Sequence, residues 1–341
     1  IKTEYLAQYY DANGVPLRSR IFGNIHLINR LGSMAAPLAN AATRGPLARF
    51  GKQMLGVHPD REIAPFAKET FEEWFQGRRD VKPSGKRGLA VFFHDTFVNY
   101  NYPEIGIAAV ELLEAAGYSV EIVERRACCG RPMLSKGLVE GARKLARQNV
   151  EALMPYARQG VPIIGTEPSC ILTLRDEYPD LLPDSPDVER IANNSFMIDE
   201  FLAKQLDDGT LDIAWSEADG PHVLFHGHCH QKALIGMGPS MSILRAAGCV
   251  PAESGAGCCG MAGSFGYETE HYEVSRKVGA ERLFPKVEEQ SRETVIAVTG
   301  VSCREQIGHF TKRRPVHIAE VLASRLTPAK SASRTLEQAA D

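Results

Sequence analysis

Two adjacent cysteines stand at the centre of a glycine-rich stretch in the second half of the chain. The stretch covers residues 255–266, with Cys258 and Cys259 in the middle. Neighbouring cysteines are poorly placed to bond to each other, because a disulfide needs a Cα separation and a Cβ orientation that one trans peptide strains to supply. The surrounding glycines allow positive φ angles and a close approach to a bound object. We therefore expect a loop around a metal centre, and a weaker copy of it at Cys128 and Cys129.

Other cysteines recur at similar distances from the two pairs. In the second half, 28 residues separate Cys229 from the pair Cys258 and Cys259, and 43 residues separate this pair from Cys303. In the first half, 32 residues separate Asp95 from the pair Cys128 and Cys129, and 40 residues separate this pair from Cys170. Each position follows a predicted strand, and ligands collect at the carboxyl edge of an open α/β sheet. Four converging thiolates suit either an iron-sulfur cluster or tetrahedral zinc, since both are soft-ligand sites.

The first half offers a second, weaker metal site with three cysteines and nearby carboxylates. Its members are Asp95, Cys128, Cys129 and Cys170, with Glu167 beside them. The remaining cysteine, Cys249, follows Gly248 at a predicted strand and is interpreted as a small buried hydrophobic residue.

Histidines crowd the sequence around Cys229. His226, His228 and His230 are interpreted as alternative metal ligands, as hydrogen-bond donors in the second shell of a centre, or as proton carriers. The alternative is that they are solvated loop residues. We favour His230, with His228 and Glu167 as further second-shell residues. A phosphate-binding loop is disfavoured, because the glycines follow a cysteine pair rather than a strand and lack the Lys-Ser/Thr of a P-loop.

The elements that must position these residues alternate between strand and helix. The first half predicts strands at 89–93, 118–123 and 161–165, with helices at 103–116, 135–158 and 195–206. The second half repeats this order, with strands at 223–226 and 294–298 and helices at 239–247, 269–283 and 316–326. Such alternation implies parallel pairing with right-handed crossovers. The fold predicted is α/β, with two pseudo-symmetric Rossmann-like repeats packed face to face.

The segments outside the repeats have a different character. Residues 1–57 predict short helices with a basic side, which suits either an arm packed on the rest of the protein or a contact with an anionic membrane or acidic partner. A further helix is expected at 65–75 and a linker at 76–87. The predicted domains are a helical arm at 1–80, repeats at 88–207 and 220–326, and a disordered tail at 327–341.

Composition excludes several classes of function. The 341 residues carry a net charge of -3, which argues against nucleic-acid binding. No apolar run reaches the roughly 18 residues of a membrane span, and no signal-peptide pattern is present. We therefore expect a cytoplasmic protein, with peripheral contact at the inner face of the membrane as a further option. Eight cysteines in such a protein predict ligands or redox groups rather than disulfides.

The paired cysteine motifs resemble those of a known family. With Glu167-Pro168-Ser169-Cys170 and His228-Cys229-His230-Gln231 beside them, they look like the cysteine-rich CCG domains of heterodisulfide reductase. They are also similar to the iron-sulfur subunits of glycolate oxidase, anaerobic glycerol-3-phosphate dehydrogenase and lactate-utilisation enzymes. The resemblance covers about residues 88–326. Residues 17–25, 129–137 and 260–268 further resemble the C-terminal region of FAD-linked D-2-hydroxyacid dehydrogenases of the D-lactate and D-2-hydroxyglutarate type.

This resemblance implies an electron-transfer module without catalytic residues of its own. It implies a 4Fe-4S cluster at Cys229, Cys258, Cys259 and Cys303, which receives electrons from FAD in a partner domain or subunit through a ferredoxin-like segment and passes them to a quinone or another carrier. The fullest family motif has a further cysteine where Glu167 and Gly300 stand, and Asp95 stands in place of the leading cysteine. This reduced set leaves zinc as the alternative metal. A zinc-stabilised interaction scaffold and a substrate-facing dithiol are the competing hypotheses.

Overall fold

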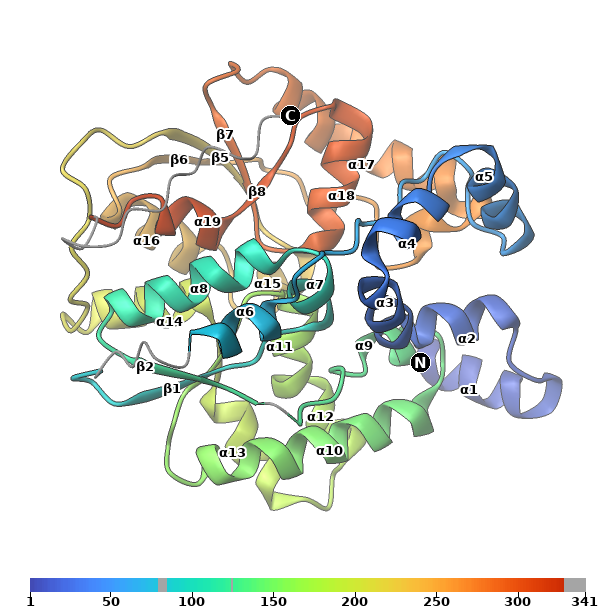
Figure 1. Ribbon diagram of the computed structural model, residues 1–341, viewed down its shortest axis with the longest axis horizontal. Helices are drawn as coiled ribbons and strands as arrows, with labels where there is room; N and C mark the ends of the chain where they lie inside the picture. Colours follow the sequence, from blue (N-terminus) through green and yellow to red (C-terminus); the bar gives the residue numbers. More distant parts are fainter. Residues whose placement is uncertain (79–84, 124, 328–341) are drawn as a thin grey trace.

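Two four-stranded sheets form the centre of the molecule, and every strand pair in them is parallel. The computed structural model describes residues 1–78, 85–123 and 125–327 (Figure 1). The strand orders are β2-β1-β3-β4 and β6-β5-β7-β8, so the second sheet repeats the arrangement of the first. The prediction of two pseudo-symmetric α/β repeats after a helical arm is confirmed.

The first repeat runs from the first strand of its sheet to a helix that faces the second repeat. Its elements are β1 (Leu89–Phe92), α7 (Thr96–Tyr100), α8 (Pro103–Ala115), β2 (Ser119–Ile122), α9 (Arg131–Ser135), α10 (Val139–Ala157), β3 (Ile163–Gly165), α11 (Pro168–Arg175), α12 (Glu177–Leu181), α13 (Pro186–Asn194), β4 (Ser195–Met197) and α14 (Ile198–Asp207). The long helix expected at 135–158 is therefore shorter and is preceded by the separate helix α9.

The second repeat follows the same order with fewer helices. Its elements are β5 (His222–His226), α15 (Cys229–Leu234), α16 (Gly238–Ala246), β6 (Val250–Glu253), the 3-10 turns η1 (Phe265–Tyr267) and η2 (Thr269–His271), α17 (Tyr272–Glu288), β7 (Val295–Val298), α18 (Val301–Thr311), β8 (Val316–His317) and α19 (Ile318–Ala323). The helix expected at 269–283 begins three residues later, because 3-10 turns precede it, and continues to Glu288.

Equivalent helices join the two repeats. Helix α8 packs on α19, and α14 packs on α16. In each contact one helix follows the first strand of its own sheet along the chain, and the other helix follows the fourth strand of the other sheet. In Figure 1 these helices lie between the two sheets. One hydrophobic cluster runs through them from Ala90 and Ile164 of the first sheet to Phe225 and Ala297 of the second. The repeats therefore share a core, as the face-to-face packing predicted.

The fourth strand of each sheet was not predicted. Residues 195–197 and 316–317 were assigned to the starts of helices, but they form β4 and β8. Each strand runs directly into a helix, and a glutamate in the first turn accepts a hydrogen bond from the residue that ends the strand: Met197 N to Glu200 Oε2, 3.1 Å, and His317 N to Glu320 Oε2, 2.7 Å. Because no turn residues separate strand from helix, the sequence pattern shows only the helix.

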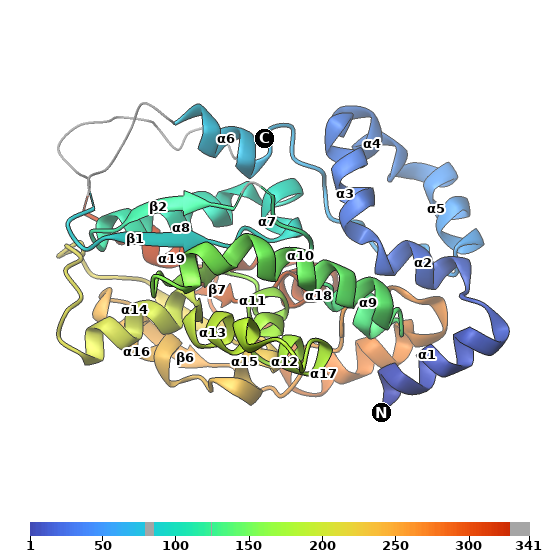
Figure 2. The same cartoon turned by 90° about the horizontal axis from the view of Figure 1, so that it is seen from below.

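The arm consists of helices and of a non-helical segment at residues 55–70, and it lies beside the repeats (Figure 2). Its helices are α1 (Lys2–Asn13), α2 (Leu17–Gly23), α3 (Ile25–Met34), α4 (Ala36–Ala42), α5 (Gly45–Met54) and α6 (Phe71–Gly77). The helix expected at 65–75 begins only at Phe71, because Thr70 and Glu73 form a capping box that sets its start. Residues 79–84 of the predicted linker and 328–341 of the predicted tail lie outside the described residues.

The arm packs on both repeats with one side. Asn29 donates to Asn101 Oδ1 of the first repeat at 2.8 Å, and Arg18 pairs with Glu270 of the second. Several large apolar side chains face outward instead, among them Met34 and Leu47, which are 78% and 87% exposed. Among the described residues, no helix has both the length and the apolar character to cross a bilayer.

A buried polar group sits in the contact between the repeats. Asp199 of α14 is fully buried, and its Oδ2 accepts hydrogen bonds from Gln231 Nε2 at 3.0 Å and Ser240 Oγ at 2.5 Å, both from the second repeat. Its Oδ1 has no partner among the described residues. Burial is the main cause that raises the pKa of this carboxyl from 3.8 to about 6.

This carboxyl predicts a pH-dependent difference between the protein and its Asp199→Asn variant. Between pH 4 and 6 the native carboxyl retains a proton that the unfolded chain releases, so its contribution to the unfolding free energy falls as pH rises and is constant above about 6. The variant should gain up to about 3 kcal/mol relative to the parent across that window. Urea unfolding at pH 4, 5, 6 and 7 measures this. Asp208→Asn, an exposed change of the same charge, is the control, and a pH-independent difference for Asp199→Asn would contradict the prediction.

Candidate metal centre

The four cysteines of the second repeat come together from three separate loops. Cys229 is the first residue of α15 after β5, Cys258 and Cys259 follow β6, and Cys303 lies in the first turn of α18 after β7. Their thiols form a chain of contacts in the order Cys229, Cys258, Cys259, Cys303. All are free thiols, and exposure decreases from Cys229, which is exposed, to Cys303, which is 1% exposed. The four cysteines predicted as ligands thus form a chain of neighbouring thiols, and their binding of a metal stays a prediction.

The surroundings of this cluster favour thiolates at two positions. Hydrogen bonds from the thiols of Cys229 and Cys259, with a further one from Gly260 N at 3.3 Å, lower the pKa of Cys258. A hydrogen bond from Cys259 lowers the pKa of Cys303, and His226 adds to this effect against the cost of burial. Since metals bind the thiolate form, this environment suits a soft metal centre.

Charged and polar neighbours hold the loop that carries the cysteine pair. Lys232 of α15 donates from Nζ to the carbonyl oxygens of Ala256, at 2.5 Å, and Gly257, at 3.3 Å. His226 Nδ1 shares a 2.8 Å hydrogen bond with Ser254 Oγ, which leaves its buried Nε2 without a hydrogen-bond partner among the described residues, beside the cysteines. Lys232 was not predicted, although it stands next to the cysteine motif in the sequence, whereas His226 is one of the three histidines interpreted as ligands, hydrogen-bond donors or proton carriers.

The glycine after the pair is required by close packing. Gly260 has φ +92°, and a Cβ added there would lie 2.2 Å from the carbonyl oxygen of Ser275 on α17. Arg61 of the arm reaches the same place: its Nη2 donates to Ser275 Oγ at 3.1 Å and its Nε to Gly266 O at 2.7 Å. The arm thus holds the loop from outside. A lone arginine outside the repeats gave no signal for this role.

The three cysteines of the first repeat are also close together but in a different environment. Cys129 Sγ lies 3.2 Å from Cys170 Sγ. Contact with Cys129 and burial raise the pKa of Cys128. The hydrogen bond from Cys129 lowers the pKa of Cys170, but burial and the carboxylates of Asp95 and Glu167 outweigh it and raise that pKa to about 12. This set therefore favours protonated thiols, whereas in the second repeat the pKa values of Cys258 and Cys303 are lowered and those of Cys229 and Cys259 are raised by contact with their neighbours and by burial.

Two fully buried polar side chains fix the first loop. Asn149 of α10 donates to Cys128 O at 3.1 Å and to Tyr178 Oη at 2.8 Å, and the Tyr178 hydroxyl donates to Cys129 O at 3.1 Å. Sequence reasoning missed both. A signal was present for Asn149, because it falls three residues after Ala146 and four before Leu153, on the apolar stripe of its helix.

Strand register shows which residues of the repeats are equivalent. Phe92 pairs with Ile164 as Phe225 pairs with Ala297. In the register that matches Cys170 with Cys303, these two pairs correspond, and counting on from them places Asp95 opposite His228 rather than Cys229. Both are N-cap residues whose side chains accept a hydrogen bond from the second following amide. Thr96 therefore occupies the position of Cys229. The same register makes Glu167 equivalent to Gly300.

These two equivalent positions meet between the repeats. Glu167 is 5% exposed, and its Oε2 accepts a 2.8 Å hydrogen bond from Val301 N at the start of α18. Its Oε1 accepts from Ser169 Oγ at 2.5 Å, and this hydroxyl lies 3.5 Å from His228 Nε2. Glu167, Ser169 and His228 thus form a hydrogen-bonded link between the repeats, close in sequence to Cys170 and Cys229, and the roles predicted for Glu167 and His228 beside a metal stay predictions.

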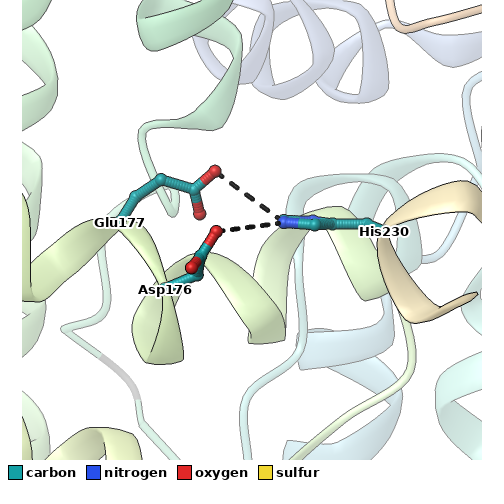
Figure 3. Close-up of side chains that lie close together, drawn as sticks. All are labelled: Asp176, Glu177 and His230. Carbon is teal, nitrogen blue, oxygen red and sulfur yellow. Dashed lines mark ion pairs between the residues drawn. The ribbon is translucent and has the colours of Figure 1, made fainter. Parts of the chain in front are cut away.

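The favoured histidine, His230, faces carboxylates of the first repeat. Its Nε2 lies 3.7 Å from Asp176 Oδ2 and 3.8 Å from Glu177 Oε1, as Figure 3 shows. These three side chains are close enough to hold a cation. Arg131, however, already pairs with Glu177. Burial is the largest cause that lowers the pKa of His230 to about 4. We interpret the group as a polar contact between the repeats, in which a neutral His230 faces the carboxylates of Asp176 and Glu177.

The donor set of the second repeat fits a soft metal centre. A chain of four neighbouring thiols, a backbone N–H directed at one sulfur and a backbone at Gly260 that leaves no room for a Cβ are features that favour such a centre. Cys229, Cys258, Cys259 and Cys303 would hold it.

Comparison with known proteins places both repeats in one family of domains. The family model described as CCG, a cysteine-rich domain, matches residues 91–175 and 223–308. A subunit of anaerobic glycerol-3-phosphate dehydrogenase from Escherichia coli K12 is 30% identical over 321 residues, which is 93% of this chain and 79% of that protein. D-2-hydroxyglutarate dehydrogenase of the same organism is 27% identical over 90% of this chain and 30% of its own length. Lactate utilization protein A from Oceanobacillus iheyensis is 27% identical over 65% of this chain and 91% of its own.

Proposed function

Because this chain belongs to the family of proteins with cysteine-rich CCG domains, we propose that it is the iron-sulfur-binding electron-transfer module of a flavin-linked dehydrogenase. The observation that carries this proposal is the chain of four neighbouring thiols in the second repeat, in which the pKa values of Cys258 and Cys303 are lowered. Cys229, Cys258, Cys259 and Cys303 would bind a 4Fe-4S cluster. When bound, such a cluster supplies one-electron transfer.

The relatives support the class of substrate that the parent enzyme would oxidise. Glycerol 3-phosphate, 2-hydroxyglutarate and lactate, the compounds in their names, each carry a secondary hydroxyl group. We propose a D-2-hydroxy acid as the substrate, with FAD in a partner domain or subunit and a ferredoxin-like segment between that flavin and this module. The role of this chain is then to bind and insulate the redox centre. Burial of Cys259 and Cys303 keeps water from the inner thiols.

Metal analysis of the anaerobically purified protein tests this proposal. We expect iron and acid-labile sulfide in equal amounts, a brown visible absorption and an EPR signal in one redox state. A colourless protein with stoichiometric zinc and no iron would overturn the cluster and leave the zinc-stabilised scaffold. Full alkylation of the cysteines without loss of metal or activity would exclude both a metal and a dithiol role.

The arm supplies a surface for peripheral contact with a membrane, where a quinone acceptor would be found. Six large apolar side chains of α3, α4 and α5 are between 64% and 87% exposed: Leu31, Met34, Leu38, Leu47, Phe50 and Met54. Residues 1–57 also carry seven Lys or Arg against two acidic residues. Amphipathic helices with this combination bind in the interface plane of anionic bilayers.

Changing two of these residues to glutamate should release the protein from vesicles. Phe50→Glu with Met54→Glu removes apolar area from α5 and adds negative charge, so partition onto vesicles of anionic phospholipid should fall by about tenfold or more. Co-sedimentation measures it. Val274→Glu, at a 51% exposed apolar position on α17, is the matched control and should bind as the parent does. Absence of vesicle binding by the unmodified protein would rule out this role of the arm.

A further inference from the structure

A large cleft lies between the arm and the second repeat. It has a volume of about 800 Å³ and is lined by the start of α5, by the segment that follows α5, and by the end of α18 with the residues after it. Met261, two residues after Cys259, also lines it. The cleft therefore reaches from solvent to the loop of the proposed metal centre.

The lining of this cleft is strongly basic. Eight of its residues are lysine or arginine and three are aspartate or glutamate, in a chain whose net charge is -3. Among the described residues, three of these cations form no ion pair or side-chain hydrogen bond: Arg44, Lys312 and Arg314. Arg49, by contrast, pairs with Asp60 at 2.9 Å. The cleft thus has an excess of positive charge that the rest of the protein leaves unneutralised.

Two further features of the cleft favour an anion. Arg61, only 1% exposed, lines it, and its Nη1 has no hydrogen-bond partner among the described residues. The ten-residue helix α5 begins there at Gly45, with Pro46 in its first turn, and no side chain caps its N-terminus. A free helix N-terminus carries partial positive charge and unpaired N–H groups, which bind phosphate or carboxylate.

We propose that this cleft binds a polyanionic small molecule that carries phosphate or carboxylate groups. Its volume lies within the range of about 300 to 1,000 Å³ that is usual for small-molecule sites. Arg44 and the N-terminus of α5 would contact the ligand from the arm, and Lys312 and Arg314 from the second repeat. Since the ligand would bridge the two, it would also fix the arm against the loop that Arg61 holds.

Calorimetric titration of the full chain tests this site, with pyrophosphate and citrate as probes at about 0.1 M salt, where long-range charge effects are screened. We expect saturable binding of at least one of them, at one site per chain. In the double variant Lys312→Gln with Arg314→Gln, the dissociation constant should rise by roughly tenfold or more, because two charge-assisted contacts are lost.

A matched variant distinguishes a defined binding site from a general effect of the protein's positive charges. Lys277→Gln with Arg282→Gln removes the same two charges from exposed positions of α17 outside the cleft, and should leave the affinity within about twofold. Equal weakening in both double variants would overturn the proposal, as would no binding of either probe by the unmodified chain. Binding of polyglutamate but of neither probe would also overturn it and assign the cleft to an acidic partner protein.

Discussion

Replacing Cys303 with serine should remove most of the iron from the purified protein. Cys303 is the most buried member of the four-thiol cluster, and its thiol contacts both Cys259 and His226. A serine hydroxyl is a harder ligand that stays protonated near neutral pH, so one of the four soft donors is lost. Second-shell changes alone cost about 10- to 100-fold in metal affinity, and loss of a ligand should cost at least about tenfold in bound iron. Iron per chain and the EPR signal measure it.

Two other cysteines serve as controls for this experiment. Cys249 is 6% exposed but stands apart from both clusters, so Cys249→Ser reports the cost of any buried cysteine-to-serine change. Cys170→Ser tests the first repeat, whose surroundings favour protonated thiols, and should leave the iron content unchanged. Equal iron in all three variants would exclude Cys303 as a ligand. If Cys303→Ser lost thermal stability and assembly together while the protein carried zinc, the scaffold function would be supported.

Replacing Gly260 with alanine should destabilise the protein more than the same change at any other position of the two loops. The residue has φ +92°, which costs an alanine roughly 1 to 2 kcal/mol, and its Cβ would meet a backbone oxygen of α17 at 2.2 Å. Backbone atoms of a helix cannot move aside as a flexible side chain can. We expect a loss of about 3 kcal/mol or more in unfolding free energy, and weaker metal binding, because Cys258 and Cys259 lie in the same loop.

Two further glycines of these loops give a graded comparison. Gly130 has φ +90°, but its Cβ would lie 3.4 Å from Ala142, so Gly130→Ala should cost only about 1 to 2 kcal/mol. Gly257 has open space around it and no positive φ, so Gly257→Ala should change stability by less than about 0.5 kcal/mol. Urea unfolding of the three variants gives the order. A Gly260→Ala variant as stable as Gly257→Ala would show that the close approach to Ser275 is not maintained in solution.

The repeat architecture could be predicted because its signals are local and occur twice. Short strands end a few residues before Cys128, Cys170, Cys258 and Cys303, and parallel pairing brings such ends to one edge of a sheet. The helices predicted at 195–206 and 316–326 stand at matching places in the two repeats, and residues 198–202 and 318–322 of them lie in the helices that face the other repeat. The four-thiol cluster of the second repeat follows from the same logic.

The parts that could not be predicted depend on long-range contacts or on single-residue register. Nothing near Arg61 in the sequence indicates that it reaches Ser275, 214 residues away. Alignment by residue type placed Asp95 at the position of Cys229, whereas strand pairing puts Thr96 there, because a shift by one residue leaves the spacing pattern almost unchanged. The strands β4 and β8 are too short to show a period of two before a helix begins.

The hydrogen bond from Val301 N to Glu167 bears on why the two repeats share one chain. The residue equivalent to Val301 in the first repeat is Pro168, which has no N–H. A symmetric dimer of two first repeats would bury two carboxylates without this donor, and a dimer of two second repeats would have glycine on both sides and no carboxylate. The contact therefore exists only between unlike halves. Joining them in one polypeptide ensures that unlike halves always meet, which lets one cysteine cluster keep four thiols while the other departs from that set.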